Sequence, residues 1–169
     1  MELPQENLNR INPKAVEPQD ISDYLLQRWP MLLIDSIIDH EPGKWAIGIH
    51  AASRNESFFT GHYPDNPIMP GTMMLEAMSQ VATFILTSGG LVGIKHGAGL
   101  LFAGVDKLRF FRVVRPGETI LFHCALMDDR MGIYKITGNG RVNGEMCISA
   151  TMSFALMSKT ESQSETEVK

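Results

Sequence analysis

The stretch "FFTGHYPDNPIMPGTMMLEAMSQ", residues 58–80, runs from an irregular loop into a helix and decides the fold of this protein. Pro70 has the fixed φ that suits a first helical turn, and good helix formers follow from Gly71 until Gly89 and Gly90. Apolar residues occupy nearly the whole circumference of this predicted helix, which is typical of a helix enclosed by other elements. We therefore expect one buried central helix.

Strand-like segments lie on both sides of this helix in the sequence. Before it, residues 21–27 are predicted as a short helix, and residues 31–40 and 44–53 are predicted as a hairpin joined by "EPG". In the second of these strands, four alternate residues share one face: Trp45, Ile47, Ile49 and Ala51. After the helix, three or four more strands are expected between Leu100 and Met157.

The last of these strands has the clearest pattern. From Met146 to Leu156, apolar residues alternate with small or polar ones, as expected when one face of a strand meets the core. Turn signals separate the strands at "RPGE" (115–118), "DDRMG" (128–132) and "VNGE" (142–145). One buried helix with several antiparallel strands predicts an α+β fold in which the sheet wraps around the helix.

The length and composition predict one globular domain with two peripheral segments. The chain has 169 residues, of which 44% are hydrophobic and 20% charged, enough for one sizeable core. We expect an N-terminal extension over 1–19, a folded domain over 20–157 and a disordered polar tail over 158–169.

Charge and hydropathy argue against several classes of partner. The net charge of -4 and the pI near 5.7 provide no basic field for nucleic acid. No uninterrupted apolar stretch of about 18 residues is present to span a bilayer. The first ten residues lack the basic and apolar regions of a secretory signal, so a cytoplasmic protein is expected. Cys124 and Cys147 stand singly within apolar segments and are interpreted as buried reduced thiols.

Glu76 is the only formally charged side chain between Asp65 and Lys95. A carboxyl group in apolar surroundings favours its protonated form, so Glu76 can act as a general acid. Gln80, four residues further on, shares the same helix face and can hydrogen-bond Glu76. A structural alternative stays open, in which the carboxyl group reaches a partner or solvent.

A histidine and the start of the helix complete the candidate chemistry. His62 lies in the irregular GHYP segment, where a loop can aim an imidazole at a pocket as a general base, although a hydrogen-bonded structural histidine also fits. The N–H groups of Gly71 and Thr72 are helix N-terminal donors that can polarise a carbonyl oxygen. An acid, a base and such donors suit abstraction of a proton next to a thioester with loss of a β-hydroxyl group.

The remaining candidate ligands are interpreted as structural. Four other histidines lack comparable neighbours: His40, His50, His96 and His123. The spacing of His62, Asp65 and Glu76 matches no compact metal-ligand motif, and no phosphate-binding glycine motif is present. We therefore expect neither a metal nor a cofactor.

Three segments carry a resemblance to a known family. The stretch "GHYPDNPIMPGTMMLEAMSQ" (61–80) closely resembles the active-site signature of the β-hydroxyacyl-acyl carrier protein dehydratases of type II fatty acid synthesis, the FabZ type. "QRWPMLLIDSI" (27–37) resembles the first strand of that family, and "FAGVDKLRFFRVVRPGE" (102–118) resembles its third strand. The resemblance covers roughly residues 20–157.

The resemblance implies a fold, a reaction and an assembly. The fold is the hot-dog fold, an antiparallel sheet wrapped around a long central helix, in homodimers that can assemble further into hexamers as trimers of dimers. The reaction is dehydration of (3R)-3-hydroxyacyl thioesters to trans-2-enoyl thioesters. The acyl chain is linked to the phosphopantetheine group of acyl carrier protein, which is the expected partner, whereas nucleic acid and membranes are not.

The resemblance also implies roles for individual residues. His62 removes the α-proton and Glu76 helps the 3-hydroxyl group to leave as water, with the two residues drawn from opposite subunits. Gly71, as a backbone donor to the thioester oxygen, and Gln80 are the expected substrate-binding residues. Glu76 stands where the related dehydratase–isomerases have aspartate, which favours dehydration without isomerisation.

The chain departs from the family pattern at three places. Gln27 replaces a common histidine, and Leu101 replaces a tyrosine that can gate the substrate tunnel. Near "DDRMG" the family tends to be basic, whereas Asp128 and Asp129 adjoin a single arginine here, which weakens a docking patch for an acidic carrier protein. Four other basic residues are alternative contacts: Lys107, Arg109, Arg112 and Arg115.

Two functions of other classes stay open on sequence alone. One is a hot-dog acyl thioesterase, which would hydrolyse the thioester. The other is a non-catalytic subunit that binds acyl chains or serves in assembly. A dehydratase of a polyketide or other specialised assembly line also fits the sequence.

Overall fold

The computed structural model describes residues 16, 18–93 and 100–156. Its helices are α1 (Pro18–Ile21), α2 (Phe58–Gly61) and α3 (Gly71–Ser88). Its strands are β1 (Ser36–Glu41), β2 (Trp45–Ala51), β3 (Leu100–Phe110), β4 (Thr119–Arg130), β5 (Ile133–Val142) and β6 (Glu145–Leu156).

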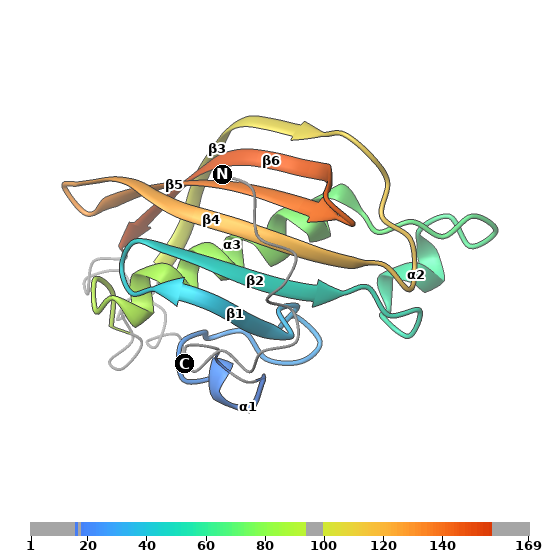
Figure 1. Ribbon diagram of the computed structural model, residues 1–169, viewed down its shortest axis with the longest axis horizontal. Helices are drawn as coiled ribbons and strands as arrows, with labels where there is room; N and C mark the ends of the chain where they lie inside the picture. Colours follow the sequence, from blue (N-terminus) through green and yellow to red (C-terminus); the bar gives the residue numbers. More distant parts are fainter. Residues whose placement is uncertain (1–15, 17, 94–99, 157–169) are drawn as a thin grey trace, which may run out of the picture.

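One curved antiparallel sheet contains all of these strands. The strand order is β1-β2-β4-β5-β6-β3, with every neighbouring pair antiparallel. Figure 1 shows the sheet arching over α3, which lies against one of its faces. The structure therefore confirms the predicted α+β architecture, in which a sheet wraps around a long central helix.

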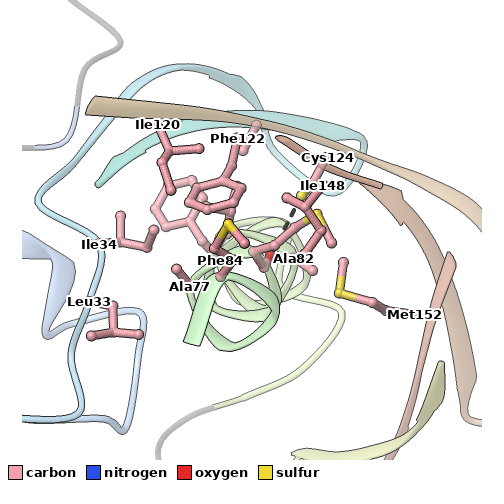
Figure 2. Close-up of a cluster of buried hydrophobic side chains, with 14 of the residues drawn as sticks. Leu33, Ile34, Ala77, Ala82, Phe84, Ile120, Phe122, Cys124, Ile148 and Met152 are labelled. Carbon is pink, nitrogen blue, oxygen red and sulfur yellow. Dashed lines mark hydrogen bonds between the residues drawn. The ribbon is translucent and has the colours of Figure 1, made fainter. Parts of the chain in front are cut away.

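The hydrophobic core fills the space between α3 and the sheet. Figure 2 shows Ile120, Phe122 and Ile148 projecting from the strands toward the helix, where they are fully buried together with Ala82 and Phe84. Burial of each large apolar side chain contributes about 1.5–3 kcal/mol to folding. This contact explains why α3 has apolar residues on most of its sides.

Two glycines allow the helix to approach the strands closely. A Cβ atom at Gly48 of β2 would collide with Cγ2 of Val81 on α3. A Cβ atom at Gly138 of β5 would lie 2.7 Å from Sδ of Met78. The helix can therefore lie close to the sheet at these two positions, because neither glycine has a side chain that would separate them.

Several local predictions are confirmed. The helix from Gly71 ends at Ser88, directly before Gly89, and β6 alternates between buried and half-buried positions as expected. In the "VNGE" turn, Asn143 and Gly144 both have positive φ, 50° and 82°, which is the geometry of a tight hairpin with the right twist.

The prediction for the segment before β1 was wrong in two respects. The helix expected over 21–27 is instead the short α1, ending at Ile21, and turns follow it. The strand expected over 31–40 begins only at Ser36. The late start of the strand has a physical reason. The Leu33 N–H and the Met31 C=O hydrogen-bond to the side chain of Gln80 on α3 rather than to a neighbouring strand.

The face of β2 that carries Trp45, Ile47, Ile49 and Ala51 is buried only at Ile47. Ala46, Gly48 and His50, on the opposite face, are all buried. At Gly48, α3 lies too close to leave room for a Cβ atom.

The division into extension, domain and tail remains a prediction. Residues 1–15, residue 17 and residues 157–169 lie outside the described residues, as does the 94–99 segment. Within the described part of the chain, no helix is long and apolar enough to cross a membrane.

The contact between Gly48 and Val81 generates a stability prediction. Gly48→Ala should lower the free energy of unfolding by about 1–3 kcal/mol, because the β-branched Val81 side chain is stiff and the helix must shift. Gly61→Ala is the matched control, since a Cβ there meets nothing within 4 Å. Urea unfolding of both variants measures the difference, and equal stabilities would contradict the close packing described here.

Candidate active site

Glu76 lies on a half-buried face of α3, beside a surface cavity of about 150 Å³. The cavity is lined by Thr72, Leu75, Glu76, Ser79 and Phe102. The expectation that apolar residues surround Glu76 is therefore corrected, because the sheet of its own chain leaves this side of the helix partly open. The carboxyl group faces a cavity instead of the sealed core.

Gln80 fixes one oxygen of this carboxyl group. Its Nε2 donates to Glu76 Oε1 at 2.8 Å and to Met31 O at 2.7 Å, and its Oε1 accepts from Leu33 N at 2.9 Å. Gln80 is 0% exposed; its bond to Leu33 is buried, and those to Met31 and Glu76 are partly buried. The expected Gln80–Glu76 hydrogen bond is confirmed, and both Nε2 protons are in use.

The two oxygens of Glu76 are consequently different. Oε1 accepts the amide proton of Gln80, whereas Oε2 lies 3.5 Å from Ser79 Oγ, a long contact. A proton on this carboxyl group is therefore best placed on Oε2. This is the state in which Glu76 can donate a proton to a group in the cavity.

His62 follows directly after α2, and its backbone N–H bonds to Phe58 O at 2.9 Å. Its ring Nδ1 lies 2.8 Å from Ile68 O. A carbonyl oxygen can only accept, so Nδ1 carries the proton and, in the neutral ring, Nε2 has the free lone pair. The half-buried imidazole is thus held in the tautomer that a general base requires.

The loop after His62 is held in a specific conformation. Tyr63 has positive φ, 59°, and its ring packs against that of His62 with centroids 4.5 Å apart. Asn66 N bonds back to Tyr63 O, and Arg115 Nη1 donates to Asn66 Oδ1 at 2.7 Å. These contacts close the GHYP turn and limit the movement of the imidazole.

Gly71 begins α3 and lies beneath an aromatic ring. A Cβ atom at this position would lie 2.8 Å from Phe110 Cζ, so a larger residue would require the Phe110 ring to move. The N-cap residue Pro70 offers no side-chain acceptor, and the first amides of a helix have none within it. The Gly71 and Thr72 N–H groups are therefore positioned as donors at the end of the helix that carries Glu76.

The described chain does not bring all four predicted site residues together. Glu76 and Gln80 are hydrogen-bonded, and Gly71 precedes Thr72 of the cavity wall. Among the described residues that line this cavity, His62 is absent. His62 is therefore not part of the cavity wall beside Glu76 in the described structure.

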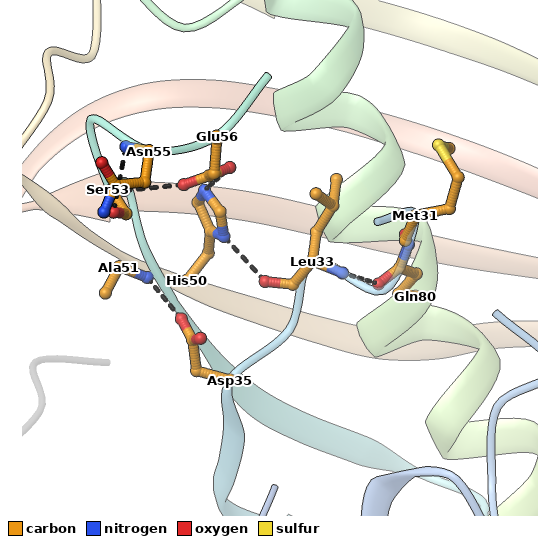
Figure 3. A network of polar contacts seen from close by, with 9 residues as sticks. All are labelled: Met31, Leu33, Asp35, His50, Ala51, Ser53, Asn55, Glu56 and Gln80. Carbon is orange, nitrogen blue, oxygen red and sulfur yellow. Dashed lines mark hydrogen bonds and ion pairs between the residues drawn. The ribbon is translucent and has the colours of Figure 1, made fainter. Parts of the chain in front are cut away.

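Two further groups near this site were not predicted from the sequence. Phe102 lines the cavity and Phe110 covers Gly71; both lie in the "FAGVDKLRFFRVVRPGE" segment, which could have indicated them. The second group is a polar network around His50 (Figure 3), a residue that was interpreted as structural. Its carboxylate partner Glu56 was not singled out, although it lies five residues before the GHYP motif begins at Gly61, within "NESFFTG".

Other titratable residues are embedded in the fold. Cys124 and Cys147 are buried free thiols, as expected, and burial raises the pKa of Cys147 to about 11. Burial lowers the pKa of His123, while the His40 ring packs against Phe84. In the described part of the chain, no group of three or more histidine, cysteine or acidic side chains is close enough to hold a metal ion.

Comparisons with known proteins match most of the chain. A family model described as a FabA-like domain matches residues 25–151. The 3-hydroxyacyl-[acyl-carrier-protein] dehydratase FabZ of Caldanaerobacter subterraneus subsp. tengcongensis is 43% identical over 141 residues, covering 83% of this chain and 98% of the relative. FabZ of Colwellia psychrerythraea is 40% identical over 139 residues, covering 82% and 92%.

Solved structures share the fold at low sequence identity. The dehydratase heterocomplex ApeI:P from Xenorhabdus doucetiae matches with a TM-score of 0.68 and 17% identity, covering 83% of this chain and 93% of that one. A hypothetical thioesterase with coenzyme A from Streptococcus pneumoniae matches with a TM-score of 0.55 and 7% identity, covering 72% and 84%. These likenesses concern the fold alone and confirm the hot-dog architecture.

The buried amide of Gln80 generates a prediction. Gln80→Leu keeps the volume but leaves Leu33 N–H and Met31 C=O without their partners, so the free energy of unfolding should fall by about 2–4 kcal/mol. Thr83→Val, one turn along α3, is the control and should change stability little. Chemical denaturation measures both, and a Gln80→Leu protein as stable as the control would disprove the anchoring role.

Proposed function

We propose that this chain, which belongs to the FabA-like domain family and to its FabZ-type 3-hydroxyacyl-[acyl-carrier-protein] dehydratases, uses His62 and Glu76 together. The two residues jointly remove water from 3-hydroxyacyl thioesters. The acyl group is carried by acyl carrier protein, as the names of the relatives state for those enzymes. The product is the 2-enoyl thioester, and we propose the (3R) substrate and the trans product.

The observation that carries this mechanism is the complementary hydrogen bonding of the two side chains. The Ile68 carbonyl holds the proton of His62 on Nδ1 and leaves a lone pair on Nε2. The Gln80 amide occupies Oε1 of Glu76 and leaves Oε2 for a proton. One group is prepared to accept a proton and the other to donate one.

The elimination then balances in one active site. Nε2 of His62 takes the proton from C2, and the electrons of that C–H bond form the C2–C3 double bond. The C3–O bond breaks as Glu76 transfers its proton to the departing hydroxyl group, which leaves as water. The Gly71 N–H group donates to the thioester oxygen, where negative charge develops during proton removal. Gln80 maintains the orientation of Glu76.

We propose that the two groups meet across a homodimer. Because His62 is not part of the cavity wall at Glu76, we propose that a second protomer supplies the base. The outer strand β3 and the segment after it expose large apolar side chains: Leu101, Phe102, Val105, Phe110, Phe111 and Val113, each between 37% and 53% exposed. An apolar sheet edge of this kind is normally covered by a partner. Further assembly into hexamers is part of the same proposal.

Docking of the acidic carrier protein is proposed to involve exposed cations near this edge. Lys107 and Arg109 are exposed on β3. Arg112, in contrast, pairs with Glu118 at 2.7 Å and with Glu145 at 3.4 Å, and Arg115 donates to Asn66. The first two are therefore better placed to contact a carrier protein than the last two.

The catalytic assignment predicts the effect of two substitutions. Glu76→Gln keeps the size of the side chain but removes the transferable proton, and His62→Ala removes the base. Each should lower kcat by about 10²–10⁴-fold while the thermal midpoint changes little, because the two groups serve one elimination. Mass spectrometry of 3-hydroxyacyl carrier protein, following the loss of one water, measures the rate.

The same assay separates the competing functions. A thioesterase would release a free thiol, and an acyl-binding subunit would bind the loaded carrier protein without changing its mass. A folded Glu76→Gln protein with full dehydratase activity would refute the proposed role of the carboxyl group.

The shared site predicts complementation between two inactive variants. Co-expression of Glu76→Gln and His62→Ala chains with different tags allows the mixed dimer to be purified. One of its sites combines an intact His62 with an intact Glu76, so activity should return to about half that of the wild-type dimer. If each chain instead supplied both groups to its own site, the mixed dimer would be no more active than either parent.

A further inference from the structure

The backbone of Leu33 is held between two buried side chains. Its N–H donates to Gln80 Oε1 at 2.9 Å, and its carbonyl oxygen lies 2.7 Å from His50 Nδ1. This segment precedes β1 and lies outside the sheet, so both polar groups of Leu33 depend on side chains. Figure 3 shows Leu33 between His50, which projects from β2, and Gln80 of α3. The His50 ring therefore lies behind the peptide that anchors Gln80.

His50 has a carboxyl partner on its other side. Its Nε2 lies 3.5 Å from Glu56 Oε2, and both atoms are buried without a hydrogen-bond partner within the described structure. The second oxygen of Glu56 accepts from Ser53 N at 2.6 Å, which fixes the carboxyl group in the loop after β2. His50 itself is 2% exposed. The imidazole is thus confined between a carbonyl oxygen and a carboxyl group.

The chemistry of these groups requires a proton on one of the two facing atoms. Leu33 O can only accept, so Nδ1 of His50 is protonated. Two lone pairs facing each other at Nε2 and Oε2 would be repulsive in the interior, so a proton lies on one of them. Burial raises the pKa of Glu56, with the positive charge of His50 acting in the opposite direction, and a raised pKa is consistent with retention of that proton.

A continuous chain of contacts follows from these distances. It runs from Glu56 to His50, through the Leu33 peptide to Gln80, and from Gln80 to Oε1 of Glu76. Asp35, the other carboxylate near Glu56, is engaged separately, since its Oδ2 accepts from Ala51 N. The position of the Gln80 amide therefore depends on His50 rather than on the helix alone.

We propose that His50, held by Glu56, is a positioning residue that acts through Leu33 and Gln80 to orient Glu76 for proton donation. This inference rests on the proposed dehydratase function, because it gives Glu76 the role of acid. Without the Nδ1 donor, the Leu33 carbonyl is buried and unpaired, and the 31–33 segment shifts to find another partner. Gln80 then moves with the peptide that holds it.

The test compares two substitutions at one position. His50→Leu removes the donor to Leu33, whereas His50→Asn retains an N–H group at nearly the same distance from the backbone as Nδ1. His50→Leu should lower kcat by about 10- to 100-fold with KM little changed, because small displacements of a reacting group reduce the rate this strongly. His50→Asn should recover at least 10-fold of that loss. His123→Asn, a half-buried histidine outside this chain of contacts, is the control.

A readout independent of activity accompanies the kinetics. The side-chain amide signals of Gln80 in an ¹H–¹⁵N NMR spectrum should shift in His50→Leu and stay close to wild type in His50→Asn and His123→Asn. If His50→Leu does not fold, Glu56→Leu removes the partner that holds the ring and should show both the lower kcat and the shifted amide signals.

The outcomes separate the inference from the function on which it rests. Equal kcat in His50→Leu, His50→Asn and wild type, or unmoved Gln80 signals, would overturn the positioning role. A loss of kcat that is the same for His50→Leu and His50→Asn, and that follows the fall in thermal midpoint, would also overturn it. A wild-type protein without dehydratase activity would refute the proposed function, whereas the amide signals would still decide whether His50 fixes Gln80.

Discussion

The close packing of α3 against the curved sheet is the constraint on which the rest of the structure depends. The helix can lie this near only because β2 and β5 have glycines, Gly48 and Gly138, where they cross it. The apolar residues of the helix are thereby buried against strands that are distant in the sequence. The same contact leaves one side of α3 without a cover from its own chain, and Glu76 lies on that side.

A single buried amide connects this scaffold to the candidate chemistry. Gln80 satisfies two backbone groups of the 31–33 segment and uses its remaining proton on Glu76. A buried amide with all of these bonds formed is rigid, because breaking any of them leaves a polar atom of the buried Gln80 side chain without a partner. The same side chain, Gln80, therefore anchors the 31–33 segment and orients the Glu76 carboxyl group.

Carbonyl acceptors determine where protons lie on both histidines of this region. Ile68 O holds a proton on Nδ1 of His62, and Leu33 O does so on Nδ1 of His50. The consequences differ because of what faces the opposite nitrogen. At His50 a carboxyl group lies 3.5 Å from Nε2 and the pair is buried, whereas the His62 ring is half-buried and no described hydrogen bond uses its Nε2. We infer that the same tautomer supports the structure at His50 and allows proton transfer at His62.

The sequence by itself determined the central helix, the strands after it and their tight turns, since these follow from local periodicity and from residues that tolerate positive φ. It also indicated His62, Glu76 and the Gln80–Glu76 contact, because helical spacing and an isolated charge are visible in one segment. Only the tertiary structure decided that β1 starts at Ser36 and that β2 buries Ala46, Gly48 and His50. Those features, like the His50–Glu56 pair and the partly open side of Glu76, depend on which distant segments pack near α3. Local sequence patterns do not indicate such long-range contacts.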